Sequence, residues 1–214
     1  MTEREFFSIL VNRVIINIIE RVFMIGKQAP DFSCTAVWEN KKQEKFSLKD
    51  VVTDYKLLFF YPADFTFVCP TEMHALQEKI EDFTVRGVTV LAVSTDGADI
   101  HEQWLKTPKK EGGVEGITFA LLADEDKTMS FDYGVFDEKE KVALRGSFLL
   151  DKNNIVQVAT VHNFPLGRNV EELLRVVDAL QFSEKHGKVC PANWTEGKPA
   201  LETTQESVKN YFSK

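Results

Sequence analysis

A chain of 214 residues, 43% of them hydrophobic, is long enough to bury one core of ordinary size. Its formal net charge of −7 and its lack of any basic run argue against DNA or RNA as a main partner. Three cysteines and four histidines lie singly, which excludes the disulfide framework of a small secreted protein and the ligand spacing of a zinc site. We therefore expect free thiols and a cytoplasmic protein.

The first 23 residues are apolar, but Arg13 interrupts them and acidic residues flank them. They are too short and too polar for a membrane helix, and they lack the basic leader of a signal peptide. Their apolar residues fall on one helical stripe, which predicts an amphipathic extension that packs on the body or on a partner chain. The alternative is that the first methionine comes from an upstream start codon, because the sequence from Met24 also resembles the start of a protein chain.

Short apolar runs in the middle of the chain predict strands. They lie at residues 30–38, with 45–50 as a partner or turn, and at 55–61, 88–95 and 119–124. Residues 146–161 predict a hairpin that turns at Lys152–Asn154. The nearly continuous apolar run at 88–95 indicates a strand that is buried on both faces.

Segments with helical spacing alternate with these strands. They lie at 69–86, which Gly87 ends, at 98–106, near 129, at 170–180 and at 206–212. This order predicts an α/β protein with a mixed central sheet flanked by helices, the layout of a thioredoxin-like fold with insertions. We expect residues 24–187 to form the domain and residues 188–214 to form a C-terminal tail.

The stretch FFYPADFTFVCPTE places Cys69 at the predicted start of a helix. Unpaired backbone N–H groups and the positive end of the helix dipole stabilise a thiolate there, and a thiolate is the nucleophilic form of cysteine. Thr66 lies three residues before Cys69, and Pro62, at the start of the loop before the helix, is expected to stiffen this loop and to shield the sulfur from water. The alternative is that Cys69 is a small buried hydrophobic residue, as free cysteines often are.

Four motifs in order carry a resemblance to a known family. They are PADFTFVCP around Cys69, ALRGSFLLD with Arg145, FPLGRNVEELLR with Arg168, and GKVCPANW with Cys190. From about Ile25 onward the chain resembles the typical two-cysteine peroxiredoxins, the group that includes the peroxidase component of bacterial alkyl hydroperoxide reductase and the thioredoxin peroxidases. The resemblance implies an enzyme that reduces hydrogen peroxide and organic hydroperoxides.

The resemblance also implies roles for the matching residues. The Cys69 thiolate attacks the peroxide, while Thr66, Arg145 and the backbone N–H of Cys69 stabilise the reacting oxygens. Glu72 corresponds to a glutamate that binds the arginine, and Arg168 to a second arginine of the pocket. Judged on sequence alone, Glu72 is also typical of a helix first turn, and Arg168 of a surface or capping residue.

By the same resemblance, the sulfenic acid on Cys69 condenses with Cys190 of a second protomer, which implies a homodimer and, in many members, a decamer. Thioredoxin or a flavin-dependent reductase then recycles the disulfide. The chain has no flavin or nicotinamide motif, so we expect no cofactor. Cys34 matches no catalytic position, and we interpret it as a core thiol.

Two other functions remain as alternatives. One is a holdase chaperone, a behaviour linked to high oligomers in this family. The other is a disulfide reductase, which the lack of a CxxC pair disfavours. Overoxidation-sensitive members carry a GGLG loop and a C-terminal Tyr-Phe pair. This chain keeps Tyr211-Phe212 but has Val114 and Glu115 in the loop, so we expect intermediate sensitivity.

Overall fold

The computed structural model describes residues 24–213, so the predicted N-terminal extension lies outside the described residues. Within this range, no helix is long and apolar enough to cross a membrane.

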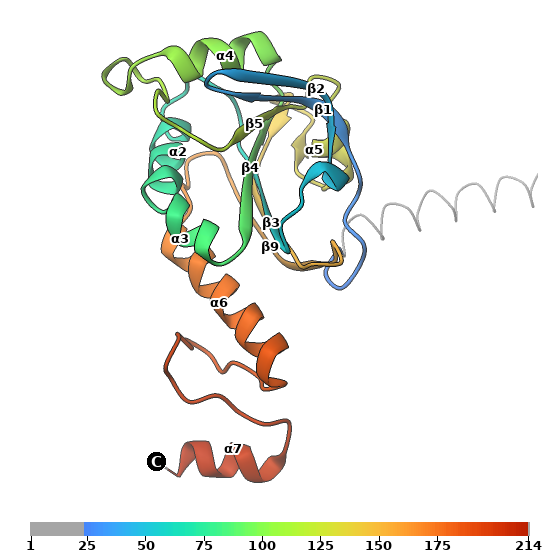
Figure 1. The fold of residues 1–214 in the computed structure, drawn as a ribbon, viewed down its shortest axis with the longest axis vertical. Helices are drawn as coiled ribbons and strands as arrows, with labels where there is room; N and C mark the ends of the chain where they lie inside the picture. The colour runs from blue at the N-terminus through green and yellow to red at the C-terminus, as the bar shows by residue number, and fades with distance from the viewer. Residues whose placement is uncertain (1–23, 214) are drawn as a thin grey trace, which may run out of the picture.

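A seven-stranded sheet in the order β2-β1-β5-β4-β3-β8-β9 forms the centre of the protein (Figure 1). The inner strands β3, β4 and β5 run parallel, whereas the other pairs are antiparallel, so the expected mixed sheet is confirmed. Its strands are β1 Ser33–Trp38, β2 Lys41–Ser47, β3 Tyr55–Phe60, β4 Val88–Ser94, β5 Ala120–Ala123, β8 Arg145–Leu150 and β9 Val156–His162.

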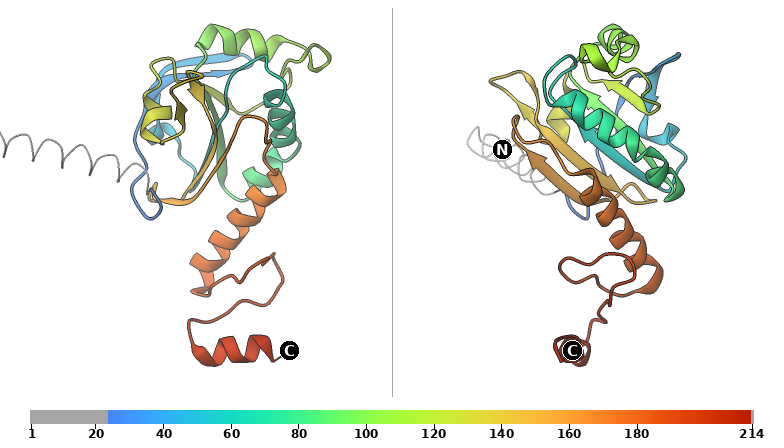
Figure 2. Two further views of the ribbon diagram at one scale, coloured as in Figure 1. Left: turned by 180° about the vertical axis from the view of Figure 1, so that it is seen from behind. Right: turned by 90° about the vertical axis from the view of Figure 1, so that its left-hand side faces the viewer.

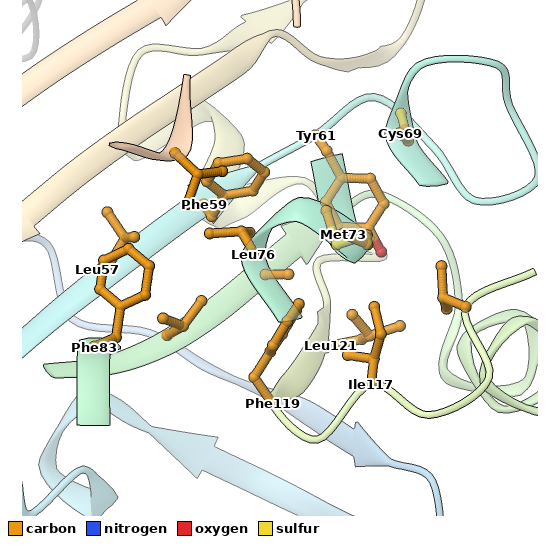
Figure 3. Packing of buried hydrophobic residues seen from close by; sticks show 14 of the residues in the cluster. Leu57, Phe59, Tyr61, Cys69, Met73, Leu76, Phe83, Ile117, Phe119 and Leu121 are labelled. Atoms are coloured by element: carbon orange, nitrogen blue, oxygen red, sulfur yellow. The ribbon is translucent and has the colours of Figure 1, made fainter. Parts of the chain in front are cut away.

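Strand β3 separates two hydrophobic cores because its side chains point alternately to the two faces of the sheet. Leu57, Phe59 and Tyr61 pack on the face covered by α2, α3, α4 and α6, whereas Leu58 and Phe60 pack on the face of α5. Figure 3 shows the first core from close by, with Cys69 at its margin. The cysteine therefore sits where the core meets the loop after β3.

The helices lie at α2 Cys69–Glu78, α3 Ile80–Val85, α4 Ala98–Lys106, α5 Thr128–Asp132, α6 Val170–His186 and α7 Gln205–Phe212. The prediction of one helix over 69–86 is wrong, because the chain breaks at Lys79, which has φ −112° and ψ 9°. The Lys79 amide donates to the carbonyl of Leu76, a tighter turn than that of an α-helix. Periodicity missed the break because Leu76 and Phe83 are buried on both sides of it.

Short elements that the sequence analysis missed occupy the loops. They are the 3-10 turn Lys109–Glu111 and a two-stranded sheet of β6 Phe136–Asp137 and β7 Val142–Ala143. The 3-10 turn Leu48–Asp50 lies within residues 45–50, which were expected to form a partner strand or a turn. Strand β7 leads directly into β8, which begins at Arg145.

The C-terminal tail projects beyond the end of α6 and finishes in α7 (Figures 1 and 2). A bridge between Val189 and Leu201 closes its first part into a loop. Trp194 is 1% exposed, and the centre of its ring lies 4.8 Å from that of Phe182 on α6, which anchors this loop to the helix.

Truncating the fully buried Leu76 to alanine is expected to lower the free energy of unfolding by about 2–5 kcal/mol, because it leaves a cavity under the sheet. The matched control Val85→Ala removes an apolar side chain that is 79% exposed and is expected to change it by less than about 0.5 kcal/mol. Urea unfolding measures both. Equal losses in the two variants would contradict the assigned core.

Candidate active site

Cys69 is the first residue of α2 and is fully buried. Pro70 follows it inside the first turn, where its missing N–H costs nothing because that group has no partner within a helix. The carbonyl of Val68 accepts hydrogen bonds from the amides of Thr71 and Glu72, which fixes the start of the helix. The sulfur therefore lies at the positive end of α2, as the sequence predicted.

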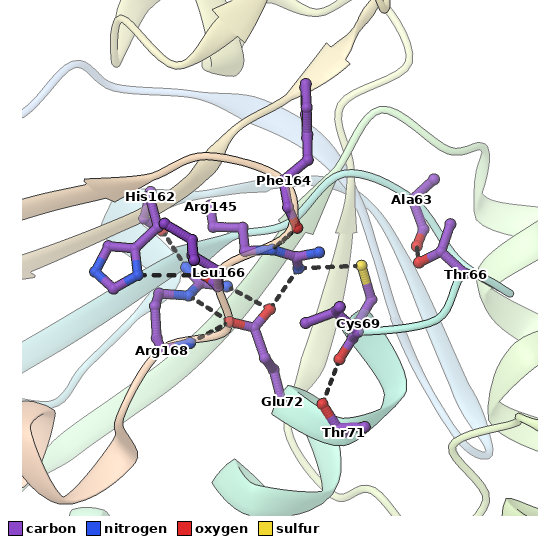
Figure 4. Close-up of polar contacts among 12 residues, drawn as sticks. Ala63, Thr66, Cys69, Thr71, Glu72, Arg145, His162, Phe164, Leu166 and Arg168 are labelled. Atoms are coloured by element: carbon purple, nitrogen blue, oxygen red, sulfur yellow. Dashed lines mark hydrogen bonds and ion pairs between the residues drawn. The ribbon is translucent and has the colours of Figure 1, made fainter.

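Arg145 extends from the start of β8 toward the sulfur (Figure 4). Its Nη1 lies 3.4 Å from Cys69 Sγ and donates a 2.7 Å hydrogen bond to Glu72 Oε2. Its Nε donates to the carbonyl of Phe164 at 2.8 Å. These contacts hold the guanidinium in one orientation beside the thiol.

Glu72 lies between two buried arginines. Its Oε1 accepts hydrogen bonds from the backbone N and the Nε of Arg168, each at 2.9 Å, and its Oε2 accepts from Arg168 Nη2 at 3.1 Å. Burial alone raises the pKa of Glu72, but the hydrogen bonds and charge of Arg168 and the charge of Arg145 outweigh it and lower the pKa below its ordinary value. Glu72 is therefore a carboxylate near neutral pH.

Arg168 is 9% exposed, so the alternative of a surface arginine is wrong. Its Nη1 donates to the carbonyl of Gly146 at 2.7 Å and to the hydroxyl of Ser147 at 3.1 Å, and its guanidinium lies 3.1 Å from the centre of the Phe59 ring. Burial lowers the pKa of Arg168 to about 10, although Glu72 raises it, so the side chain stays charged at neutral pH.

The three ionised groups carry one net positive charge, since two arginines face one carboxylate. The Cys69 sulfur therefore lies beside a buried cluster that carries one net positive charge, 3.4 Å from the Arg145 guanidinium.

Thr66 and Arg145 flank the sulfur in Figure 4. The hydroxyl of Thr66 donates to the carbonyl of Ala63 at 2.9 Å rather than to the sulfur. Pro62, Thr66 and Arg145 line an outer hollow of about 580 Å³ whose walls are mostly apolar and include Phe67 and Phe164. Arg145 is the lining residue of this hollow that also contacts the Cys69 sulfur.

The structure brings together six of the seven predicted site residues, all except Cys190. Cys190 lies in the tail, where its sulfur is 3.6 Å from the carbonyl of Ala179 on α6. Burial raises the pKa of Cys190, and the nearby charge of Arg175 offsets part of that rise.

All three cysteines lie within residues 24–213 and are free thiols. Burial raises the pKa of Cys34, in β1, to about 12, and the side chain is partly buried against the second core rather than inside it.

Sequence reasoning missed the backbone acceptors that hold the arginines. The carbonyls of Phe164 and Gly146 accept from Arg145 and Arg168 respectively. Every residue has a carbonyl, so no sequence signal marks these two.

Sequence comparison identifies the family. Residues 25–159 match the AhpC/TSA family, and residues 179–214 match the C-terminal domain of 1-Cys peroxiredoxin. The chain belongs to the AhpC/TSA family. This confirms the predicted resemblance. Although the second domain is named after one-cysteine proteins, Cys190 lies within it.

Known members of the AhpC/TSA family match nearly the whole chain. Peroxiredoxin-2 of Mus musculus is 45% identical over 190 residues, which cover 89% of this chain and 96% of that protein. Thioredoxin peroxidase of Echinococcus granulosus is 43% identical and covers 89% of this chain and 98% of its own length. The crystal structure of reduced Plasmodium vivax 2-Cys peroxiredoxin is 43% identical, with a TM-score of 0.86 over 90% of this chain and 100% of that one. These matches confirm the thioredoxin-like fold.

Replacing Glu72 by glutamine is expected to lower the free energy of unfolding at pH 7 by about 3–5 kcal/mol, because two buried arginines lose their counter-charge. A lowered pKa in the folded state contributes stability that is fully present above the ordinary value of 4.5 and is lost as the pH falls through the lower folded value. The difference between wild type and variant is therefore expected to shrink below pH 4.5. Urea unfolding over a pH series measures it.

The matched control is Glu171→Gln, which removes a carboxylate whose side chain is 67% exposed and bound to Lys79. It is expected to have little effect at any pH, because exposed ion pairs contribute little. A Glu72→Gln variant as stable as this control would contradict the proposed charge balance.

Proposed function

We propose that the chain is a thiol peroxidase that reduces hydroperoxides through Cys69. The observation that supports this most directly is the buried thiol at the start of α2, 3.4 Å from a guanidinium that is itself fixed by Glu72. The names of the relatives, peroxiredoxin and thioredoxin peroxidase, support the same reaction.

In the proposed reaction, the Cys69 thiolate attacks the terminal oxygen of R–O–OH along the O–O bond. An S–O bond forms, the O–O bond breaks, and RO⁻ leaves and takes up a proton. The sulfur is oxidised to a sulfenic acid while the peroxide is reduced to an alcohol or to water. Negative charge moves from sulfur to oxygen, so fixed donors near both oxygens lower the barrier.

Arg145 is placed to donate to the reacting oxygens while it keeps contact with the sulfur. Thr66 already donates its hydrogen to Ala63, so its oxygen is available to accept the O–H of the peroxide. This differs from the donor role expected from the sequence. In this proposal Pro62 walls the pocket, while Glu72 and Arg168 hold Arg145 in place and supply the charge balance.

We further propose that Cys190 resolves the sulfenic acid. Its thiol attacks Cys69–S–OH, the disulfide forms and water leaves. Cys69 and Cys190 contact different parts of this chain, which is consistent with a bond to a second protomer in a homodimer. On this proposal residues 24–187 form the peroxidase domain, 188–214 carry the resolving cysteine, and thioredoxin or a similar reductase in the cytoplasm restores both thiols.

The variant Cys69→Ser is expected to abolish peroxide consumption, because serine is not ionised at neutral pH. Cys190→Ser is expected to keep one rapid turnover, which leaves sulfenic acid on Cys69. Stopped-flow peroxide consumption, mass spectrometry and a non-reducing gel measure these outcomes. A peroxide-dependent dimer band in wild type that persists in Cys190→Ser would refute the proposed pairing. Suppression of aggregation by Cys69→Ser would support the chaperone alternative.

The apolar outer hollow indicates that organic hydroperoxides are accepted beside hydrogen peroxide. Phe67 is 95% exposed and lines the hollow, so Phe67→Ser should fold normally. We expect kcat/KM for cumene hydroperoxide to fall roughly 10-fold and that for hydrogen peroxide to stay nearly constant, because only the larger substrate contacts the ring. Val52→Ser, at a residue 94% exposed but outside the hollow, is the control and should change neither value.

A further inference from the structure

A buried polar network lies behind the loop that joins β3 to α2. The carboxylate of Asp64, in this loop, accepts a 2.7 Å hydrogen bond from the Tyr61 hydroxyl and lies 2.7 Å from Nδ1 of His101 on α4. The side chains of Asp64 and His101 are 1% and 0% exposed. Burial raises the pKa of Asp64, and the hydrogen bond and charge of His101 offset part of that rise.

The backbone of the loop is anchored at the same point. The amide of Asp64 donates to Asp96 Oδ2 at 2.9 Å, and the same oxygen accepts from the hydroxyl of Ser94 at the end of β4. The next residue, Phe65, has φ 53°, a left-handed conformation that a non-glycine residue keeps only where its surroundings impose it. Asp64 is therefore the residue through which β3, β4 and α4 fix the shape of the loop.

The anchor is adjacent to the site. The residue before Asp64 is Ala63, whose carbonyl accepts the hydroxyl of Thr66 and so determines where the threonine oxygen points. His101 contacts the Asp64 carboxylate, Asp64 is joined to Ala63 by the peptide bond, and the Ala63 carbonyl accepts the hydroxyl of Thr66. We infer that Asp64 and His101 are positioning residues, which set the orientation of Thr66 toward the peroxide without contacting it.

Burying these polar groups costs desolvation free energy, so the network is a poor source of folding stability. His101 Nε2 is buried and has no hydrogen-bond partner among residues 24–213, so the pair leaves one polar atom unsatisfied. Well-packed apolar residues of similar volume often match or exceed a buried charged pair in stability. A directional hydrogen bond holds the loop in one conformation, which an apolar contact does not, and this favours positioning over stabilisation.

This inference rests on the proposed peroxidase function, and the test compares two reactions of Cys69. Reaction with hydrogen peroxide needs oriented groups around both oxygens, whereas alkylation by iodoacetamide needs only an accessible thiolate. His101→Leu is expected to slow the peroxide reaction about 10- to 100-fold, the scale of a misplacement of about 1 Å. The alkylation rate should stay within about 3-fold, since the thiolate itself is unchanged.

His101→Asn should restore most of the peroxide rate, because its amide nitrogen stands near the position of Nδ1 and still donates to Asp64. Tyr61→Phe keeps the ring and removes only the hydroxyl that also donates to Asp64, so it should slow the peroxide reaction as well. If His101→Leu does not fold, Tyr61→Phe alone tests whether the Asp64 network positions Thr66. Stopped-flow tryptophan fluorescence measures the peroxide reaction, and mass spectrometry measures alkylation.

The matched control is Ser130→Ala on α5, which deletes a buried 2.6 Å hydrogen bond to Asp124 on the other face of the sheet. It should lower stability and leave both rates unchanged. A folded His101→Leu or Tyr61→Phe that reacts with peroxide at the wild-type rate would overturn the inference, as would equal slowing in Ser130→Ala. If wild type itself reacts no faster than free cysteine, the proposed function fails instead.

Discussion

The site depends on the two ion pairs that the carboxylate of Glu72 makes with the buried side chains of Arg145 and Arg168. The carboxylate neutralises one of the two positive charges and fixes the guanidinium of Arg145 beside the sulfur. The cluster keeps one net positive charge beside the Cys69 sulfur. One ion-pair network thus balances buried charge in the folded chain and also holds a guanidinium in place beside the thiol.

The mixed sheet explains how residues far apart in sequence reach this carboxylate. Strands β3 and β8 are hydrogen-bonded neighbours, so the helix start after β3 and the arginine at the start of β8 lie at the same edge of the sheet. Arg168 approaches from the segment after β9, which pairs with β8 on its other side. The network is local in space, although its members are separated by up to 96 positions.

The two cysteines are held in different ways. Cys69 lies on the rigid body of the protein, at the margin of a core. Cys190 lies in a tail that is anchored mainly through Trp194 and the contacts of α6. Such a division suits a reaction whose first step needs fixed groups and whose second step needs a segment that moves, because few buried contacts resist movement of the tail.

The sequence by itself determined most strands and helices and the family, because short apolar runs and four ordered motifs are local patterns. It also identified six side chains that meet at one site. Only the tertiary structure decided that Arg168 is buried, that Thr66 donates to a backbone carbonyl, and that the helix after Cys69 breaks at Lys79. The sequence also could not predict the contact of His101 with the loop after β3. A hydrogen bond between residues 37 positions apart depends on how α4 packs on the sheet. Local patterns record which residues repeat along the chain, whereas burial and partners are set by the three-dimensional packing of distant segments.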